Sequence, residues 1–126
     1  MNITLIRHSE VQKDYIGCYN GHIDIELSQT GHKEAKNLAK KLKHKKYDAI
    51  FCSDLKRAKQ TLSYFKRKNV IFTKELREKS WGRHEGMSYD EIVKKEGIEY
   101  ENFLQWIEFL DGESIDEFQA RVKNFF

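Results

Sequence analysis

Cysteine is scarce in this sequence, and long apolar segments and clustered metal ligands are absent. The two cysteines, Cys18 and Cys52, are too few for a disulfide framework or a zinc cluster. No His, Cys, Asp or Glu residues recur at the spacing of metal ligands, so we expect no metal and no other cofactor. No apolar run is long enough to span a bilayer, and Met1 is not followed by a basic segment and an apolar stretch. We therefore expect a cytoplasmic protein that does not bind a membrane.

The composition is that of a globular protein. The 126 residues can bury one core, and the shares of charged (34%) and hydrophobic (39%) residues are typical of folded rather than disordered chains. We therefore expect a single domain over residues 1–126. The net charge of +3 is mild, and the lysine-rich segment 40–46 contains apolar residues at helical spacing. This pattern favours a solvated helix face, so we expect no nucleic-acid partner.

Strand and helix signals alternate along the first half of the chain. Short apolar runs predict strands over Asn2–Arg7, Asp48–Ser53 and Val70–Thr73. Helical spacing predicts two helices between these strands, preceded by Ser28 and Asp54. Their apolar positions are Ala35, Leu38, Ala39 and Leu42 in the first helix and Leu55, Ala58, Leu62 and Phe65 in the second. Strands joined by helical crossovers predict an α/β fold with a mainly parallel sheet.

Helix signals continue in the second half. Ser88 with Glu91 and Ser114 with Glu117 match the capping-box pattern, and Gly97 is suited to end the first of these two helices. A further helix between them has an apolar face formed by Tyr100, Phe103, Leu104, Ile107 and Leu110. The apolar face of the last helix is formed by Ile115, Phe118, Val122 and Phe125. Its pattern reaches Phe126 without a stop signal, so we expect further chain to follow.

The first predicted strand ends in Arg7 and His8, and this pair suggests phosphate chemistry. Ligands of open α/β sheets gather at the carboxyl ends of strands, and the guanidinium fork of arginine matches phosphate oxygens. His8 would then act as a nucleophile or as a general base. Arg57 follows the second predicted strand, where it can converge with Arg7 and His8 on one anion. A surface turn would show the same Arg-His pair, so further motifs decide between these interpretations.

Four segments of the chain carry such motifs together. They are Leu5–Glu10, Tyr19–Ser28 with Gly31, Ser53–Thr61 and Leu76–Gly86. They resemble the signature strand end, the substrate loop, the second arginine motif and the acid-bearing loop of the histidine phosphatase superfamily, which includes phosphoglycerate mutases and α-ribazole phosphatases. The resemblance implies a phosphoglycerate mutase-like fold of three layers, α/β/α, with a mainly parallel sheet.

The resemblance also implies a role for each matching residue. His8 would attack phosphorus and form a phosphohistidine that water then hydrolyses. Arg7 and Arg57 would hold the phosphate oxygens, with guanidinium charge where a divalent ion would otherwise serve. Glu78 would protonate the leaving oxygen and later help to deprotonate water. The remaining contacts to substrate or phosphate would come from Asn20, Gly21 and His22.

Each site residue also has a purely structural interpretation. Arg57 could be a solvated cation among neighbouring lysines, and Glu78 could form a surface ion pair with its basic neighbours. Trp81 and Tyr19 either line the pocket or pack in the core or in a lid. His84 is expected to be a loop residue without a chemical task.

Two departures from the family pattern bear on function. Ser9 stands where the family usually has glycine, so a side chain narrows the pocket or adds a hydroxyl donor. The family also has a second active-site histidine, in a His-Gly motif on a later strand. No histidine of this chain supplies it: besides His8, the chain has His22, His32, His44 and His84. That strand is a central one beside the first, so its absence would leave strand edges unpaired and apolar surface uncovered. We therefore hypothesise a truncated chain, or a chain that completes its sheet by self-association into a homo-oligomer.

These features predict one leading function and two alternatives. The leading function is a metal-independent phosphomonoesterase that acts on a small phosphorylated metabolite through a phosphohistidine at His8. The segment Tyr19–Asp24 favours the α-ribazole phosphatase-like branch. The alternatives are phosphotransfer of the phosphoglycerate mutase type and a non-catalytic phosphate-binding module, the latter because the second histidine is absent.

Overall fold

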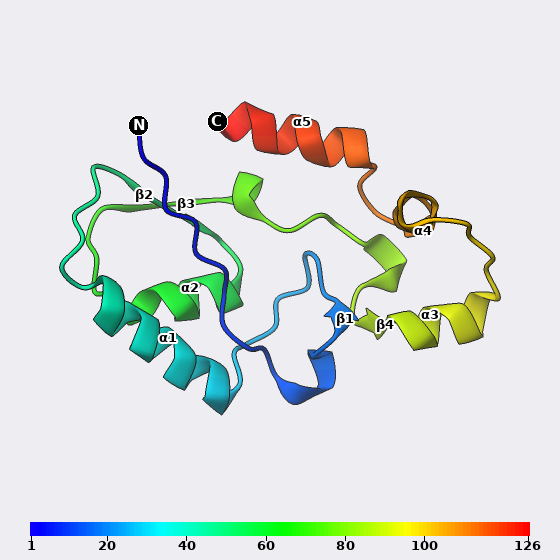
Figure 1. Cartoon of the computed structure of the whole chain (residues 1–126), viewed down its shortest axis with the longest axis horizontal. Helices are drawn as coiled ribbons and strands as arrows, with labels where there is room; N and C mark the ends of the chain where they lie inside the picture. Colours follow the sequence, from blue (N-terminus) through cyan, green and yellow to red (C-terminus); the bar gives the residue numbers. More distant parts are fainter. The chain divides into compact units, whose positions relative to one another are not determined.

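The computed structural model describes the whole chain, residues 1–126. The chain forms two compact units, of which the first contains Met1–Lys13 and Asp24–Thr73 and the second contains Asp14–Ile23 and Lys74–Phe126. Helices and strands alternate over the first part of the chain and three helices end it, which confirms the predicted α/β class (Figure 1). The single domain over the whole chain stays a prediction.

A pair of parallel strands forms the sheet of the first unit. Strand β2 (Ile50–Ser53) pairs with β3 (Val70–Thr73), with Ile50 opposite Val70 and Ser53 opposite Thr73. Helix α2 (Lys56–Ser63) connects the strands and contacts both β2 and helix α1 (Gln29–Leu42) (Figure 1). This arrangement confirms the second and third predicted strands and the helical crossover between them.

Helix α1 begins at the residue that its capping signal indicates. The Ser28 side chain is the N-cap and accepts a hydrogen bond from the Gly31 N–H (3.0 Å). Ala35 and Ala39 are buried, so the helix presents its predicted apolar face to the interior.

The prediction of a strand over residues 2–7 is wrong, because this segment has no hydrogen-bonded partner strand. The first backbone pairing occurs at Val11, which forms an antiparallel bridge with Leu27. An apolar run becomes a strand only where another segment offers a matching backbone ladder, and none does so here. Leu5 in this segment is 82% exposed. The parallel sheet, predicted to have three strands, therefore has only two.

The second unit contains a short antiparallel sheet and three helices. Strand β1 (Cys18–Tyr19) pairs with β4 (Met87–Ser88). The helices are α3 (Tyr89–Glu96), α4 (Phe103–Phe109) and α5 (Ile115–Phe125). Three short 3-10 helices lie elsewhere in the chain: η1 (Lys13–Tyr15), η2 (Lys74–Leu76) and η3 (Gly82–His84).

Both predicted capping boxes are confirmed. The side chains of Ser88 and Ser114 accept the N–H groups of Glu91 and Glu117, and each glutamate carboxylate accepts the N–H of its serine. Helix α3 ends at Gly97, whose φ of 60° lies in the left-handed region that glycine adopts most readily.

The core of the second unit is formed by Trp81, Ile92, Trp106 and Leu110. The predicted apolar face of the helix near residue 106 is wrong in part, since Phe103 is 75% exposed while Trp106 is 2% exposed. Helix α4 begins after its N-cap Asn102, and the buried residues Trp106 and Leu110 lie four residues apart towards its C-terminal end, whereas Phe103 is its first residue. Trp106 also donates its indole N–H to the Tyr19 hydroxyl (2.8 Å), which fixes its orientation.

Candidate active site

His8 has a hydrogen bond that determines which ring nitrogen carries the proton. Its Nδ1 lies 2.8 Å from the carbonyl oxygen of Ser9. A carbonyl oxygen only accepts, so Nδ1 carries the proton in this hydrogen bond. In the neutral ring, the lone pair is therefore on Nε2.

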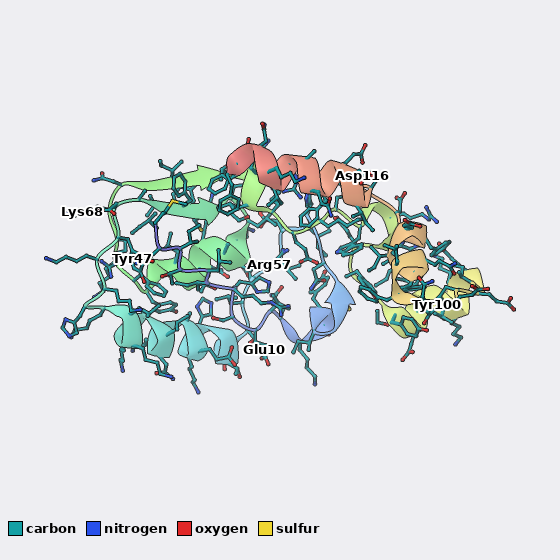
Figure 2. The ribbon with its side chains drawn as sticks, turned by 45° about the horizontal axis from the view of Figure 1, so that its top comes forward. Glu10, Tyr47, Arg57, Lys68, Tyr100 and Asp116 are labelled. Carbon is teal, nitrogen blue, oxygen red and sulfur yellow. The ribbon has the colours of Figure 1, made fainter.

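A short chain of hydrogen bonds connects the segment after His8 to the helix that carries Arg57. The Ser9 N–H donates to Thr61 Oγ1 (3.2 Å), and Thr61 Oγ1 donates to the Arg57 carbonyl (2.8 Å). Arg57 lies in the first turn of α2 and is 2% exposed, so its interpretation as a solvated cation is wrong (Figure 2). Arg7 is exposed.

The chain that follows His8 is anchored to the start of α1. The Glu10 carbonyl accepts the Ser28 N–H (3.0 Å), and the Glu10 carboxylate accepts the Ser28 hydroxyl (2.7 Å). Helix α1 approaches so closely that a Cβ added at Gly31 would lie 2.0 Å from the Glu10 carbonyl oxygen. The glycine is therefore required for the close packing that holds this segment.

Asp24 caps helix α2 from a distant part of the sequence. The N-cap residue Leu55 makes no side-chain hydrogen bond, and Asp24 Oδ1 instead accepts the Lys56 N–H (2.7 Å). A carboxylate at a helix N-terminus also interacts favourably with the helix dipole. Sequence reasoning places Asp24 in the substrate loop and misses this structural role.

In the second unit, Glu85 holds the substrate-loop residues Asn20–Ile23. Its Oε1 accepts the His22 N–H (2.8 Å) and the Trp81 N–H (3.2 Å). Gly21 has a φ of 51°, and a Cβ there would lie 2.5 Å from the same Glu85 oxygen. The loop thus turns tightly at a residue without a side chain.

A hydrogen bond from its side-chain amide orients Asn20. Its Nδ2 donates to the Tyr15 carbonyl (3.0 Å), whereas its Oδ1 is buried and has no hydrogen-bond partner. A buried polar atom without a partner is uncommon in folded proteins.

Glu78 lies in an exposed position, where both its carboxylate and its carbonyl oxygen accept hydrogen bonds. Its carboxylate accepts the indole N–H of Trp81 (2.8 Å), and its carbonyl oxygen lies 2.9 Å from His22 Nε2, which must donate to it. Trp81 and Tyr19 belong to the core or pack against it, which confirms their core interpretation.

Lys79, next to Glu78 in the sequence, is buried. Its ammonium group donates to the Ser80 carbonyl (3.0 Å) and lies 4.2 Å from the centre of the Trp81 ring. Burial lowers the pKa of Lys79, and the negative charge of Glu113 and nearby carboxylates acts in the opposite direction.

His84 is fully buried in η3 rather than in an irregular loop, and the absence of a chemical task stays a prediction. Its Nδ1 accepts the Asp111 N–H (2.9 Å), so the proton is on Nε2, which donates to the Glu96 carboxylate (3.0 Å). This hydrogen bond is the main cause of a lowered pKa at Glu96. The surrounding contacts assign His84 a structural role.

Glu113 and Arg121 form an ion pair that sequence reasoning misses. Arg121 Nε and Nη2 donate to the two carboxylate oxygens of Glu113, both at 2.8 Å. This pairing, with a further hydrogen bond from the Ser80 N–H, lowers the pKa of Glu113 to about 2. The sequence did contain a sign of this pair. Arg121 lies three residues after Phe118 and four before Phe125, so a charged residue occupies the apolar face of its helix.

The predicted site residues fall into two groups. Arg7, His8 and Arg57 belong to the first unit. Asn20, Gly21, His22 and Glu78 belong to the second unit. No group of His, Cys, Asp or Glu side chains could hold a metal ion, and no helix is long and apolar enough to cross a membrane.

Comparisons with known proteins give a consistent result. A family model for the histidine phosphatase superfamily (branch 1) matches residues 3–126. Phosphoserine phosphatase 1 of Hydrogenobacter thermophilus is 36% identical over 134 residues, a match that covers 99% of this chain and 62% of the relative. The adenosylcobalamin/α-ribazole phosphatase of Escherichia coli is 29% identical, with 99% and 64% covered.

The structure is similar to solved structures as well. The α-ribazole phosphatase from Shigella flexneri matches with a TM-score of 0.80 and 28% identity, over 95% of this chain and 62% of that one. The chain thus spans less than two thirds of the length of the relatives described here.

Proposed function

The chain belongs to branch 1 of the histidine phosphatase superfamily, and from this premise we propose that it carries a phosphomonoesterase site with His8 as the nucleophile. The observation that supports this role is the hydrogen bond from Nδ1 to the Ser9 carbonyl, which leaves the lone pair on Nε2. The substrate class is a small phosphorylated metabolite.

The reaction proceeds in two displacements. In the first, Nε2 of His8 bonds to phosphorus as the bond from phosphorus to the ester oxygen breaks, and Glu78 gives that oxygen a proton. In the second, water attacks the phosphohistidine, its proton passes to the Glu78 carboxylate, and phosphate leaves His8.

The charge of the transferred phosphate is met by arginines. Arg7 and Arg57 hold its oxygens, and the burial of Arg57 favours this role because a guanidinium outside bulk water interacts more strongly with an anion. Asn20, Gly21 and His22 contact the substrate or the phosphate.

The substrate assignment can be narrowed by similarity. Relatives named α-ribazole phosphatase cover nearly the whole chain, and the segment Tyr19–Asp24 fits that branch. We propose an α-ribazole phosphatase-like substrate, a phosphate ester of a nucleoside-like alcohol.

A non-catalytic phosphate-binding module is the second candidate. Besides His8, the histidines of the chain are His22, His32, His44 and His84, and none follows a late strand. His84 is fully buried in a structural role, so it cannot replace the second active-site histidine. In such a module Arg7, His8 and Arg57 bind an anion without turnover.

Hydrolysis of an aryl phosphate in the presence of chelator distinguishes these candidates. The test compares the chain with His8→Ala, Arg57→Lys and the control His44→Ala, which changes an exposed histidine. We expect turnover and an acid-labile phosphoenzyme that both disappear in His8→Ala, weaken in Arg57→Lys and persist in the control. Phosphate binding without turnover in the unchanged chain would instead support the binding module.

A further inference from the structure

The backbone that leads to Glu78 converges on the guanidinium of Arg121 in α5. Arg121 Nη1 donates to the carbonyls of Glu75 (2.8 Å) and Arg77 (3.0 Å), and Nη2 donates to that of Glu78 (3.1 Å). A longer contact reaches the Lys74 carbonyl (3.4 Å). One side chain thus holds several carbonyl groups of the segment that ends at the proposed proton donor.

Glu113 orients this guanidinium. It accepts two parallel hydrogen bonds from Arg121, and its Oε1 also accepts the Ser80 N–H (2.8 Å). Arg121 and Glu113 are 19% and 18% exposed at their side chains, so the pair is shielded more than a surface ion pair. Glu78 therefore lies between two anchors, Arg121 before it and Glu113 after it.

Glu78 itself has little freedom in this arrangement. Its carbonyl contacts Arg121 Nη2 and His22 Nε2, and its carboxylate accepts the Trp81 indole N–H. Trp81 in turn belongs to the core of the second unit. A shift of the chain at residues 75–78 would therefore move the carboxylate away from the indole.

We propose that Arg121 and Glu113 are positioning residues that hold the Glu78 carboxyl group where it transfers a proton. The proposal rests on the proposed function, because it names the residues that hold the proposed proton donor Glu78 in place. A lysine at position 121 offers no planar fork and cannot hold Glu113 and the carbonyls together.

The indole N–H groups provide a direct test. The chain has two tryptophans, and their indole signals are resolved by nitrogen–proton NMR: Trp81 donates to Glu78, whereas Trp106 donates to Tyr19. The Trp81 signal should shift with pH as Glu78 titrates, and Glu78→Gln should abolish that shift. We expect the shift to be lost in Arg121→Lys while the Trp106 signal stays in place.

Matched variants make the outcome decisive. Arg83→Lys changes an exposed arginine that also pairs with carboxylates of the second unit, and it should leave the Trp81 titration unchanged. Should Arg121→Lys fail to fold, Glu113→Gln makes the same test with a smaller change. An unchanged Trp81 titration in a folded Arg121→Lys or Glu113→Gln protein would overturn the proposal.

Kinetics separate this inference from the proposed function. In an active chain, Arg121→Lys should lower kcat by up to about 100-fold with little effect on KM, and should cost no more when added to Glu78→Gln. An unchanged kcat would contradict the positioning role. If the unchanged chain shows no turnover and no phosphohistidine, the proposed function fails, while the NMR titration still decides whether Arg121 positions Glu78.

Discussion

At the scale of single residues, Glu113 couples the fold to pH. Its pKa is lowered from 4.5 to about 2, first because Arg121 donates hydrogen bonds to the carboxylate and then because the Ser80 N–H does so. A carboxyl whose pKa is lower in the folded state stabilises that state when ionised. Its contribution is therefore present above pH 4.5 and is lost as the pH falls towards 2.

We predict that Glu113→Gln weakens the acid dependence of stability. The variant should have a lower Tm at neutral pH, because the ion pair is lost, and a smaller further decrease in Tm on acidification. Thermal unfolding followed by circular dichroism, from neutral pH down through the pKa of Glu113, measures both effects. Glu108→Gln, a change at an exposed residue of α4, is the control. The prediction fails if Glu113→Gln loses as much Tm on acidification as the unchanged chain.

Residue types and local motifs identified the candidate site, but they could not reveal how each side chain is held. The buried His84 is held by Glu96 and Asp111, which lie 12 and 27 residues later in the chain. Thr61 likewise connects Ser9 to Arg57 across 52 residues. Such contacts depend on the fold, so a sequence gives no local sign of them.

At the scale of elements, Gly31 determines how closely α1 approaches the chain after His8. Glycine within a helix normally costs stability relative to alanine, so Gly→Ala is usually favourable there by about 1 kcal/mol. At Gly31 the added Cβ would lie 2.0 Å from a backbone oxygen of Glu10, which cannot rotate away as a side chain would. The sign of the effect should therefore reverse.

We predict that Gly31→Ala destabilises the chain by about 1–3 kcal/mol or more, as other overpacking changes do. Gly97→Ala is the control: no atom lies within 4 Å of its added Cβ, so only the left-handed backbone opposes it, at about 1–2 kcal/mol. Urea denaturation gives both free energies of unfolding. A Gly31→Ala chain as stable as the original would show that Glu10 and α1 can separate without loss.

Three helix starts were predictable because both partners of each of these caps are close in sequence, unlike Asp24 and the start of α2. Ser28, Ser88 and Ser114 accept N–H groups three residues later, and all three predictions are confirmed. Whether residues 2–7 form a strand could not be predicted in the same way, because a hydrogen-bonded ladder requires a second segment. The face of α4 was misjudged because this helix has apolar residues on more than one side, and the core that it meets decides which side is buried.

At the scale of the whole molecule, the first unit leaves apolar side chains uncovered. Ile3, Leu5 and Ile6 are exposed in the segment that lacks a partner strand, and Phe51, Ile71 and Phe72 are exposed on β2 and β3. Soluble monomers seldom expose apolar residues in such number within one part of the chain. Strands β2 and β3 also form a sheet of only two strands, so each has an unpaired edge.

We predict that the chain self-associates through these residues. Sedimentation measured over a wide range of concentration should show species larger than a monomer, and an apolar dye should bind strongly. Leu5→Lys and Ile71→Lys should reduce both effects because a charge placed on the surface opposes its burial. Phe103→Lys is the control, since Phe103 is also an exposed apolar residue but lies on α4 in the second unit. A monodisperse monomer that unfolds cooperatively at every concentration would contradict the prediction and would mean that the first unit tolerates its uncovered apolar residues in water.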